Sequence, residues 1–217
     1  MNKETTIITV IGLAFLVIFG GAVWWYAGAN PDSGKPVTID TSAMVSADSH
    51  MTGTFGSKVT MVEWGDFQCP ACGAEYPVIN QILEHYKANP NFNFVFRNFP
   101  LPMHQNAIIG AEATEAAAAQ GKYWEMNNAL YTHQNEWGES GNPTSFFHTY
   151  AQNLGLDVAV FDAALTNHTY KAKVQADYDQ ARSLNLDHTP TLFINGVEQK
   201  DTSYAGIRKA LDAALAQ

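Results

Sequence analysis

The chain contains few cysteines and few basic residues. Only two of its 217 residues are cysteines, Cys69 and Cys72, and 12 Lys and Arg stand against 21 Asp and Glu, for a formal net charge of −9. Because Lys and Arg form no cluster along the sequence, we expect no nucleic-acid binding. Two neighbouring cysteines cannot join distant segments into a disulfide framework, and a zinc site made of four cysteines is excluded as well.

One long apolar run lies near the N-terminus. Residues 7–27 are almost continuously apolar, about the length that a bilayer-spanning helix needs. The aromatic residues 24–26 end the run, as such residues do at a membrane interface. We therefore predict a membrane anchor within residues 1–29 that crosses the membrane through residues 7–27. A cleaved signal sequence is the alternative, because residues 27–29 have the small-x-small form of a cleavage site. Both interpretations export the rest of the chain.

The rest of the chain divides into a linker and a folded domain. Residues 30–56 are polar and contain Pro and Gly, so we predict a linker there. In residues 57–217, β-branched and apolar runs predict strands, and apolar residues at three- and four-residue steps predict helices. The expected strands are residues 58–64, 91–99, 191–194 and 197–199, with an Asn195-Gly196 hairpin turn, and the expected helices beside them are residues 70–88 and 203–216.

Between the second and third expected strands, the pattern is helical from about residue 104 to residue 186. A connection of that length is far longer than the sheet requires, so we predict an inserted all-helical subdomain. The order is strand, helix, strand, helical insertion, hairpin and final helix. It predicts an α/β protein with a thioredoxin fold and a helical insertion, preceded by an N-terminal transmembrane helix.

The two cysteines fall where the first strand turns into the first helix. Cys69 precedes Pro70, which suits the first helical position, and Cys72 follows one helical turn later. Free backbone N–H groups and the helix dipole stabilise a thiolate there, so we expect a redox dithiol. Cys69 is the predicted nucleophile, and Cys72 the residue that resolves the mixed disulfide. Zinc would need two more soft ligands, and no histidine has a matching spacing, so we expect neither a metal nor another cofactor.

Four segments of the chain resemble the DsbA-like thiol–disulfide oxidoreductases, nearest their membrane-anchored, BdbD-type branch. The resemblance spans residues 59 to about 215. Strongly oxidising members of the family are similar to Cys-Pro-His-Cys at the dithiol, whereas this chain has Ala71 in place of the histidine, so the resemblance does not fix the redox potential. The segments are VEWGDFQCPAC at residues 62–72, FRNFPL at 96–101, WEM at 124–126 and HTPTLFING at 188–196.

The resemblance implies two further site elements. A cis peptide bond between Thr189 and Pro190 would face the dithiol and present the backbone of Thr189 to an extended substrate segment. Glu63 would help to move the proton during thiol exchange. The strand pattern places Glu63 on the side of Val59, so we expect it beneath the first helix with a pKa raised by desolvation. A carboxylate that reaches solvent at the strand end is the alternative.

The surface around the dithiol is expected to hold substrate. We predict that Trp64, Phe67, Pro70 and Ala71 line an apolar groove for unfolded polypeptides; for the two aromatic residues, plain core packing is the alternative. Asp66 is expected to be a turn residue.

Taken together, these features predict an enzyme that introduces disulfides into exported proteins through Cys69. We expect a single-pass protein of the cell membrane with its catalytic domain outside the cytoplasm. Its partners would be reduced or unfolded exported proteins and a quinone-linked thiol oxidase of the membrane. Two alternatives stay open: a disulfide reductase or isomerase supplied by a membrane thiol reductant, and a non-catalytic binding or chaperone module of the same fold.

Overall fold

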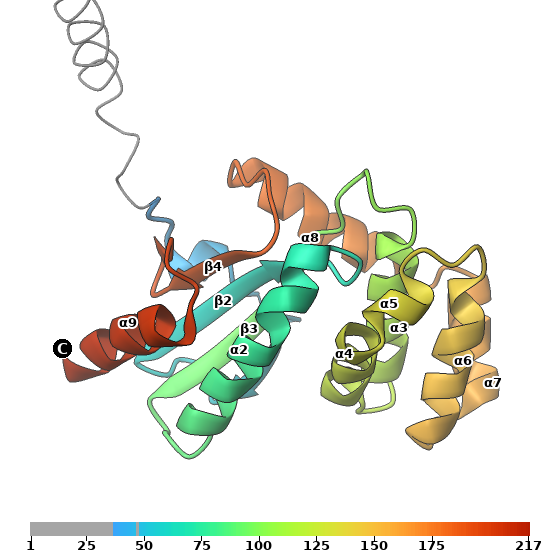
Figure 1. Ribbon diagram of the computed structural model, residues 1–217, viewed down its shortest axis with the longest axis horizontal. Coiled ribbons are helices and arrows are strands. Elements are labelled where there is room, and N and C mark those ends of the chain that lie inside the picture. The colour runs from blue at the N-terminus through green and yellow to red at the C-terminus, as the bar shows by residue number, and fades with distance from the viewer. Residues whose placement is uncertain (1–36, 47) are drawn as a thin grey trace, which may run out of the picture. The chain divides into compact units, whose positions relative to one another are not determined.

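A five-stranded sheet with the strand order β1-β3-β2-β4-β5 forms the centre of the fold (Figure 1). The computed structural model describes residues 37–46 and 48–217. Strands β2 and β3 are parallel, and the other neighbouring pairs are antiparallel. The strands are β1 (His50–Gly53), β2 (Val59–Gly65), β3 (Phe92–Asn98), β4 (Thr191–Ile194) and β5 (Val197–Glu198).

Strand β2 is the innermost element, paired on both edges and covered on both faces. All seven of its residues are buried, which agrees with its nearly continuous apolar sequence. Glu63 is the ionisable residue of this strand, and it lies opposite Phe96 of β3 and Leu192 of β4. A carboxyl group is thereby placed in the middle of the sheet.

Two helices cover one face of the sheet. They are α2 (Pro70–Tyr86) and α9 (Tyr204–Ala216), which lie in front of the strands in Figure 1. Side chains at helical spacing pack onto this face, among them Ile79 and Ile207. The opposite face packs against Met44 and, through Ala181, against the end of α8 (Lys171–Ser183). The strands thus form a layer between two apolar cores.

Six helices form the insertion between β3 and β4. They confirm the predicted mixed α/β, thioredoxin-like fold with a helical insertion, which extends to the right in Figure 1. The helices are α3 (Ala107–Ala118), α4 (Tyr123–Thr132), α5 (Gln134–Trp137), α6 (Pro143–Asn153), α7 (Val158–Thr166) and α8 (Lys171–Ser183).

The β4–β5 hairpin turn was predicted from Asn195-Gly196. Both residues have positive φ values, 46° and 82°, which is the conformation that this dipeptide favours. A Cβ atom at Gly196 would lie 2.0 Å from the carbonyl oxygen of Ile39. Gly196 is therefore needed for the turn and also for the close approach of the N-terminal segment.

The boundary of the predicted linker, residues 30–56, needs a correction. His50–Gly53 forms strand β1 at the edge of the sheet, and Met44 is fully buried. Thr38 forms a β-bridge with Val197, at the opposite edge. We call residues 37–53 the strap, because they run from the β5 edge of the sheet to the β3 edge. A short edge strand carries little apolar pattern, so composition alone suggested a linker.

Charged side chains join the strap, the sheet and the insertion. Arg97 of β3 is 3% exposed and donates hydrogen bonds of 2.7 Å to Asp177 of α8 and to the carbonyl oxygen of Met44. His50 of the strap stacks on Tyr123 with ring centroids 3.6 Å apart. A buried charge is tolerated when it is paired and hydrogen-bonded, as Arg97 is here.

The predicted membrane segment, residues 7–27, lies outside the described residues. Among the residues that the structure describes, no helix is both long and apolar enough to span a bilayer.

Candidate active site

The two cysteines lie at the start of α2, where the chain leaves β2. Cys69 is the N-cap residue and Pro70 is the first residue of the helix. Proline suits this position because its ring presets the helical φ and it has no N–H to leave unpaired. Cys72 has no exposed surface, whereas Cys69 is 6% exposed. Both are free thiols in the structure, and Cys69 is the one that an incoming sulfur can reach.

The segment before β4 faces Cys69. The Thr189–Pro190 peptide bond is cis. The carbonyl oxygen of Thr189 lies 3.4 Å from Sγ of Cys69 and accepts a hydrogen bond from the thiol when Cys69 is protonated. The hydroxyl group of Thr189 is buried and has no other hydrogen-bond partner in the part of the chain that the structure describes, which leaves it free to donate to the Cys69 thiolate. The fold therefore brings together residues that are 120 positions apart in the sequence.

The two thiols differ in acidity. A hydrogen bond from the Cys72 thiol lowers the pKa of Cys69 from 9.0 to about 5; the Thr189 side chain and the backbone N–H groups of Cys72 and Ala71 contribute as well, against the opposing effect of burial. Burial raises the pKa of Cys72 well above 9.0, and Cys69 and Glu63 raise it further. At neutral pH Cys69 is therefore a thiolate and Cys72 a thiol.

Glu63 lies beneath α2 and is only 4% exposed, so the alternative of a solvated strand-end carboxylate is wrong. Burial raises the pKa of Glu63 from 4.5 to about 8, with a further contribution from the carboxyl group of Glu75. Glu75 was not predicted as a site residue, although its place one turn after Cys72 on a helix was an available signal. At neutral pH Glu63 holds a proton close to Cys72.

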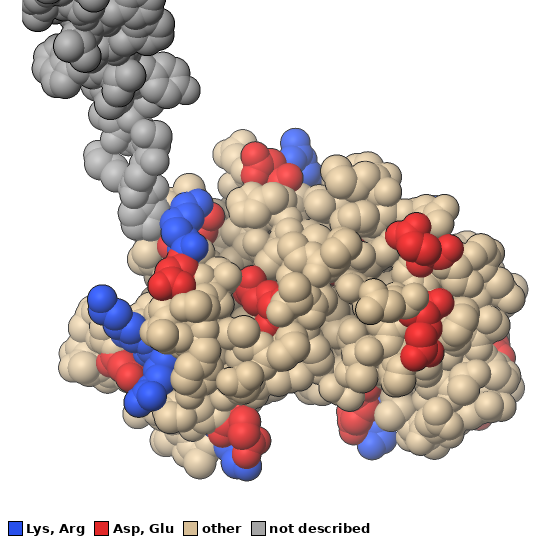
Figure 2. Space-filling view, in the orientation of Figure 1, with Lys and Arg blue, Asp and Glu red and all other residues tan. Residues whose placement is uncertain are grey.

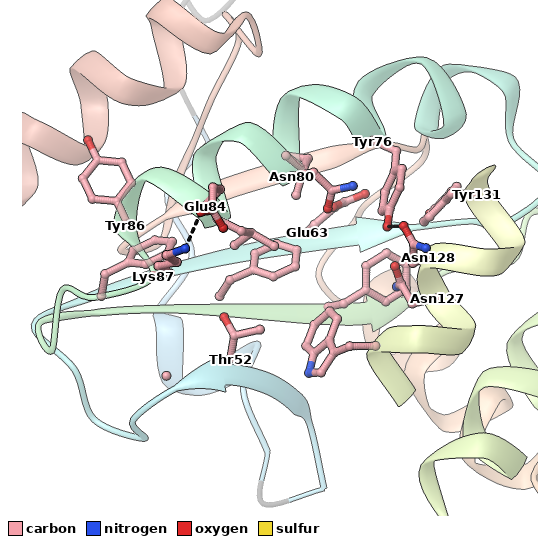
Figure 3. A pocket seen from close by; sticks show the side chains of 17 residues that line it. Thr52, Glu63, Tyr76, Asn80, Glu84, Tyr86, Lys87, Asn127, Asn128 and Tyr131 are labelled. Atoms are coloured by element: carbon pink, nitrogen blue, oxygen red, sulfur yellow. Dashed lines mark hydrogen bonds and ion pairs between the residues drawn. The ribbon is translucent and has the colours of Figure 1, made fainter. Parts of the chain in front are cut away.

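Glu63 also borders a cavity of about 600 Å³ between α2, β3 and α4. Figure 3 shows its side chain beneath α2, near Asn80 and Tyr76. Tyr76 and Asn128 also line the cavity, and the Tyr76 hydroxyl donates a 2.8 Å hydrogen bond to Asn128 of α4. Because Glu63 borders this space, its carboxyl group can exchange a proton with solvent on a side away from the substrate surface.

Asp66 fixes the turn between β2 and α2, and it is buried with 1% exposure. Its carboxylate accepts hydrogen bonds of 2.8 Å from the backbone N–H groups of Gln68 and Leu101. The Nδ1 atom of His104 lies 2.6 Å from the same carboxylate. Asp66 lies in a turn, as expected. The contact with His104 was not predicted, because 38 positions separate the two residues.

Gln134 of α5 holds the turn from the side of the insertion. Its Nε2 donates hydrogen bonds of 2.8 Å to the carbonyl oxygen of Phe67 and 2.9 Å to that of Cys69. A Cβ atom at Gly73 would lie 2.3 Å from Oε1 of Gln134, so glycine leaves the room that this contact needs. The helical insertion thus positions the backbone of Cys69.

The predicted apolar groove needs a correction. Trp64 is fully buried and Phe67 is 1% exposed, so neither reaches the surface. Trp64 points to the far face of the sheet, where the Arg97 guanidinium lies 5.0 Å from its ring centroid. Core packing, the alternative, is correct for both aromatic residues, because strand alternation and the turn direct them inward. Pro70 and Ala71 are exposed beside the dithiol.

Comparison with known families and structures agrees with this arrangement. A family model described as "Thioredoxin" matches residues 46–213. The structure of oxidised BdbD from Bacillus subtilis superposes with a TM-score of 0.73 at 19% identity, covering 85% of this chain and 100% of that one. Alpha-DsbA1 from Wolbachia pipientis gives a TM-score of 0.71 at 18% identity, covering 80% of this chain and 94% of that one. At these identities the two structures show a shared fold.

The relatives found by sequence are longer proteins. Na(+)/H(+) antiporter NhaA 1 from Mycolicibacterium vanbaalenii is 34% identical over 186 residues, which are 82% of this chain and 29% of that protein. A protein of the same name from Salinispora arenicola is 36% identical over 160 residues, 73% of this chain and 23% of that protein. The chain spans less than a third of the length of the curated relatives it matches, so their name describes more than the matched part.

Proposed function

The chain belongs to the thioredoxin family, and from that membership and the geometry at Cys69 we propose that it is a DsbA-type thiol–disulfide oxidoreductase. The observation that carries the proposal is the placement of the two thiols: Cys69 lies at the N-terminus of α2 against Thr189, and Cys72 is fully buried one turn later. The pKa of Cys69 is lowered to about 5 beside Thr189, while that of Cys72 is raised. A reactive thiol next to a buried, protonated one is the arrangement that reversible disulfide exchange requires.

In the first step, a substrate thiolate attacks Sγ of Cys69 in the oxidised enzyme. A bond forms between the substrate sulfur and Cys69, and the Cys69–Cys72 bond breaks, with its electron pair going to Cys72. The leaving Cys72 needs a proton because its pKa is high, and Glu63 holds one nearby at neutral pH. Glu63 is then reprotonated from solvent through the cavity that it borders.

In the second step, another substrate thiolate attacks the substrate sulfur of the mixed disulfide. The bond to Cys69 breaks and Cys69 leaves as a thiolate, which its lowered pKa favours. The substrate has lost two electrons and gained a disulfide; the enzyme has gained two electrons and become a dithiol. The backbone of Thr189, beside Pro190, offers a pairing site for an extended substrate segment.

We favour the oxidase direction, since the stabilised Cys69 thiolate stabilises the reduced enzyme and so makes the oxidised enzyme a better oxidant. The exposed Ala71 favours the second candidate, a reductase or isomerase, because alanine gives the thiolate less stabilisation than a histidine would. We expect a potential between about −270 mV, the value of thioredoxin, and about −120 mV, that of the strongest oxidants.

Equilibration of the purified protein with glutathione buffers tests this direction. A potential at or below that of thioredoxin contradicts the oxidase. Replacement of each cysteine tests the chemistry itself. Cys69→Ser should abolish oxidation of a reduced substrate. The Cys69 thiolate of Cys72→Ser should attack a disulfide-bonded substrate, release one substrate sulfur as a thiolate and accumulate as the mixed disulfide. Full biological activity of Cys69→Ser would favour the non-catalytic binding or chaperone module.

We further propose that the catalytic domain works outside the cytoplasm, held at the membrane through residues 7–27. Its substrates would be reduced exported proteins, and a quinone-linked membrane oxidase, or a membrane thiol reductant for the alternative direction, would restore the dithiol. The length and aromatic end of residues 7–27 support this placement. Labelling of Cys69 in intact cells with a membrane-impermeant maleimide tests it, and protection of Cys69 until lysis contradicts it.

A further inference from the structure

A second cleft lies directly beside the dithiol, with Ala71 and Glu75 of α2 on one wall. Pro190 and the residues of and after β5 form the other walls. Its volume of about 320 Å³ is at the small end of the about 300–1,000 Å³ range of ligand pockets. A space of that size suits one or two side chains of a polypeptide.

This cleft is polar, whereas the sequence predicted an apolar groove beside the dithiol. Glu75 and Glu198 both line it. Glu198 forms an ion pair with Lys200, so its charge is compensated. Among the described residues, no Lys, Arg or His forms an ion pair with Glu75. Glu75 is only 9% exposed, and its Oε1 atom lacks a hydrogen-bond partner.

A buried carboxyl group without a cation is an unfavourable arrangement that a bound cation would relieve. Burial raises the pKa of Glu75 above its ordinary 4.5, and a hydrogen bond from the Thr202 side chain opposes this effect only in part. A charge-assisted hydrogen bond from a substrate ammonium or guanidinium group would stabilise the ionised form. Lys200, the lysine that lines the cleft, is paired with Glu198. The cation that Glu75 lacks is therefore one that a substrate can bring.

The position of the cleft identifies which part of a substrate would enter it. A substrate sulfur must reach Sγ of Cys69, which contacts Thr189, and the next residue, Pro190, borders the cleft. Successive residues of an extended chain are about 3.3 Å apart. A long side chain on a residue next to the reacting cysteine can therefore extend into the cleft.

We propose that this cleft selects substrate polypeptides with a lysine or arginine beside the reacting cysteine, and that Glu75 recognises the basic side chain. The proposal rests on the proposed function, since it needs a substrate cysteine at Cys69. The charge of the whole chain acts in the same direction, because a net charge of −9 attracts cationic segments. Figure 2 shows that Lys and Arg on the visible face are spread over its left, upper and lower parts, while the insertion on the right carries mainly Asp and Glu.

The test uses the oxidised full-length protein and three single-cysteine peptides. The peptides differ only in the residue after the cysteine, which is lysine, its uncharged analogue norleucine, or glutamate. A second series places the same residues before the cysteine. Each rate of reaction with the protein is divided by the rate of the same peptide with oxidised glutathione, because a neighbouring charge also changes the reactivity of the peptide thiol.

In the wild type, the normalised rate should be about three- to tenfold higher for lysine than for norleucine in at least one series, as expected for one partly buried ion pair. The glutamate peptide should be slower than the norleucine peptide. In Glu75→Gln the ratio of lysine to norleucine should fall to about one. The matched control is Glu84→Gln, an exposed carboxylate on the same helix that pairs with Lys87, and it should keep the wild-type ratio.

Equal normalised rates for lysine and norleucine in both series overturn the proposal, and so does a Glu75→Gln variant that keeps the lysine preference. The glutamate peptide makes the test independent of how the variant folds, because it is read in the wild type alone. A different failure is also recognisable. If no peptide and no small dithiol reacts with the protein faster than with oxidised glutathione, the proposed function itself is wrong.

Discussion

At the scale of single residues, the site depends on groups whose ionisation the fold has changed. The position of Cys69 could be predicted from sequence, because it precedes a proline at a strand-to-helix turn. The residues that change the pKa of the two cysteines could not all be predicted. Glu63 followed from strand alternation, whereas the contact of Thr189 with Cys69 depends on a fold that joins positions 120 residues apart. The sequence contains the chemistry, and the tertiary structure decides which groups meet.

The lowered pKa of Cys69 predicts a pH-dependent stability of the reduced protein. A thiol whose pKa is lowered from 9.0 to about 5 on folding adds stability that is fully present above pH 9.0 and is lost as the pH falls through about 5. The reduced form should therefore gain stability relative to the oxidised form between about pH 5 and pH 9. Thermal melts of both forms measure the difference, and alkylation of Cys69 should be half-maximal near pH 5. A midpoint near 9.0 contradicts the prediction.

The Glu63 carboxyl group should change the stability of the folded protein with pH in the direction opposite to Cys69, and Glu63→Gln should remove that change. Because burial raises the pKa of Glu63 from 4.5 to about 8, the folded state binds an extra proton in this range, and stability falls as the pH rises through it. The amide removes that loss, so the variant should be more stable than the wild type near pH 9 by up to a few kcal/mol, at about 1.4 kcal/mol per pKa unit. Near pH 4.5 the difference should be smallest.

Urea unfolding of the oxidised forms measures this effect. Glu84→Gln is the control: its carboxylate is exposed, and the substitution should leave the pH dependence unchanged. An unchanged pH dependence in Glu63→Gln would show that Glu63 ionises normally.

At the scale of elements, the helices and the inner strands were predictable, and the strap was not. The helices of the insertion and the strands β2 to β4 carry clear apolar periods. Strand β1 and the segment before it are polar, and their place depends on one buried methionine and on backbone pairing to the sheet edges. Asp66 and His104 show the same limit within the site, since their contact depends on tertiary folding. Periodicity finds elements that bury a whole face, and misses those held by a few contacts.

Met44→Ala should show that the strap belongs to the folded domain. Met44 is fully buried against the far face of the sheet, so truncation to alanine should lower the free energy of unfolding by about 2–5 kcal/mol. Met103→Ala is the matched control; Met103 is 78% exposed, and its truncation should change stability by less than about 0.5 kcal/mol. Denaturant unfolding measures both, and equal effects would place the strap outside the cooperative unit.

At the scale of the whole molecule, residues 37–217 form one compact unit that contains every residue of the candidate site. The insertion, the sheet and the strap are joined around Arg97, whose side chain contacts both Asp177 and the backbone of Met44. Thiol exchange with a small dithiol needs only this unit.

Two truncations test that view of the molecule. A chain of residues 37–217 should keep the exchange rate of the full chain with dithiothreitol, because no site residue is lost. A chain of residues 54–217 lacks Met44 and strand β1, leaving β3 as an unprotected edge, so it should unfold at lower denaturant concentration and tend to aggregate. Equal unfolding midpoints for the two chains would contradict the structural role of the strap.

The strap also has a mechanical consequence. The backbone N–H of Glu198 donates a 2.8 Å hydrogen bond to the carbonyl oxygen of Val37, where the strap begins, and the Glu198 side chain lines the cleft beside the dithiol. A pulling force applied at Val37 is therefore transmitted first to Glu198 and to the bond between Ile39 and Gly196. Helix α2, which begins directly after Cys69, makes no backbone hydrogen bond to the residues that carry this force. Tension would change the wall of the substrate cleft before it could move the nucleophile.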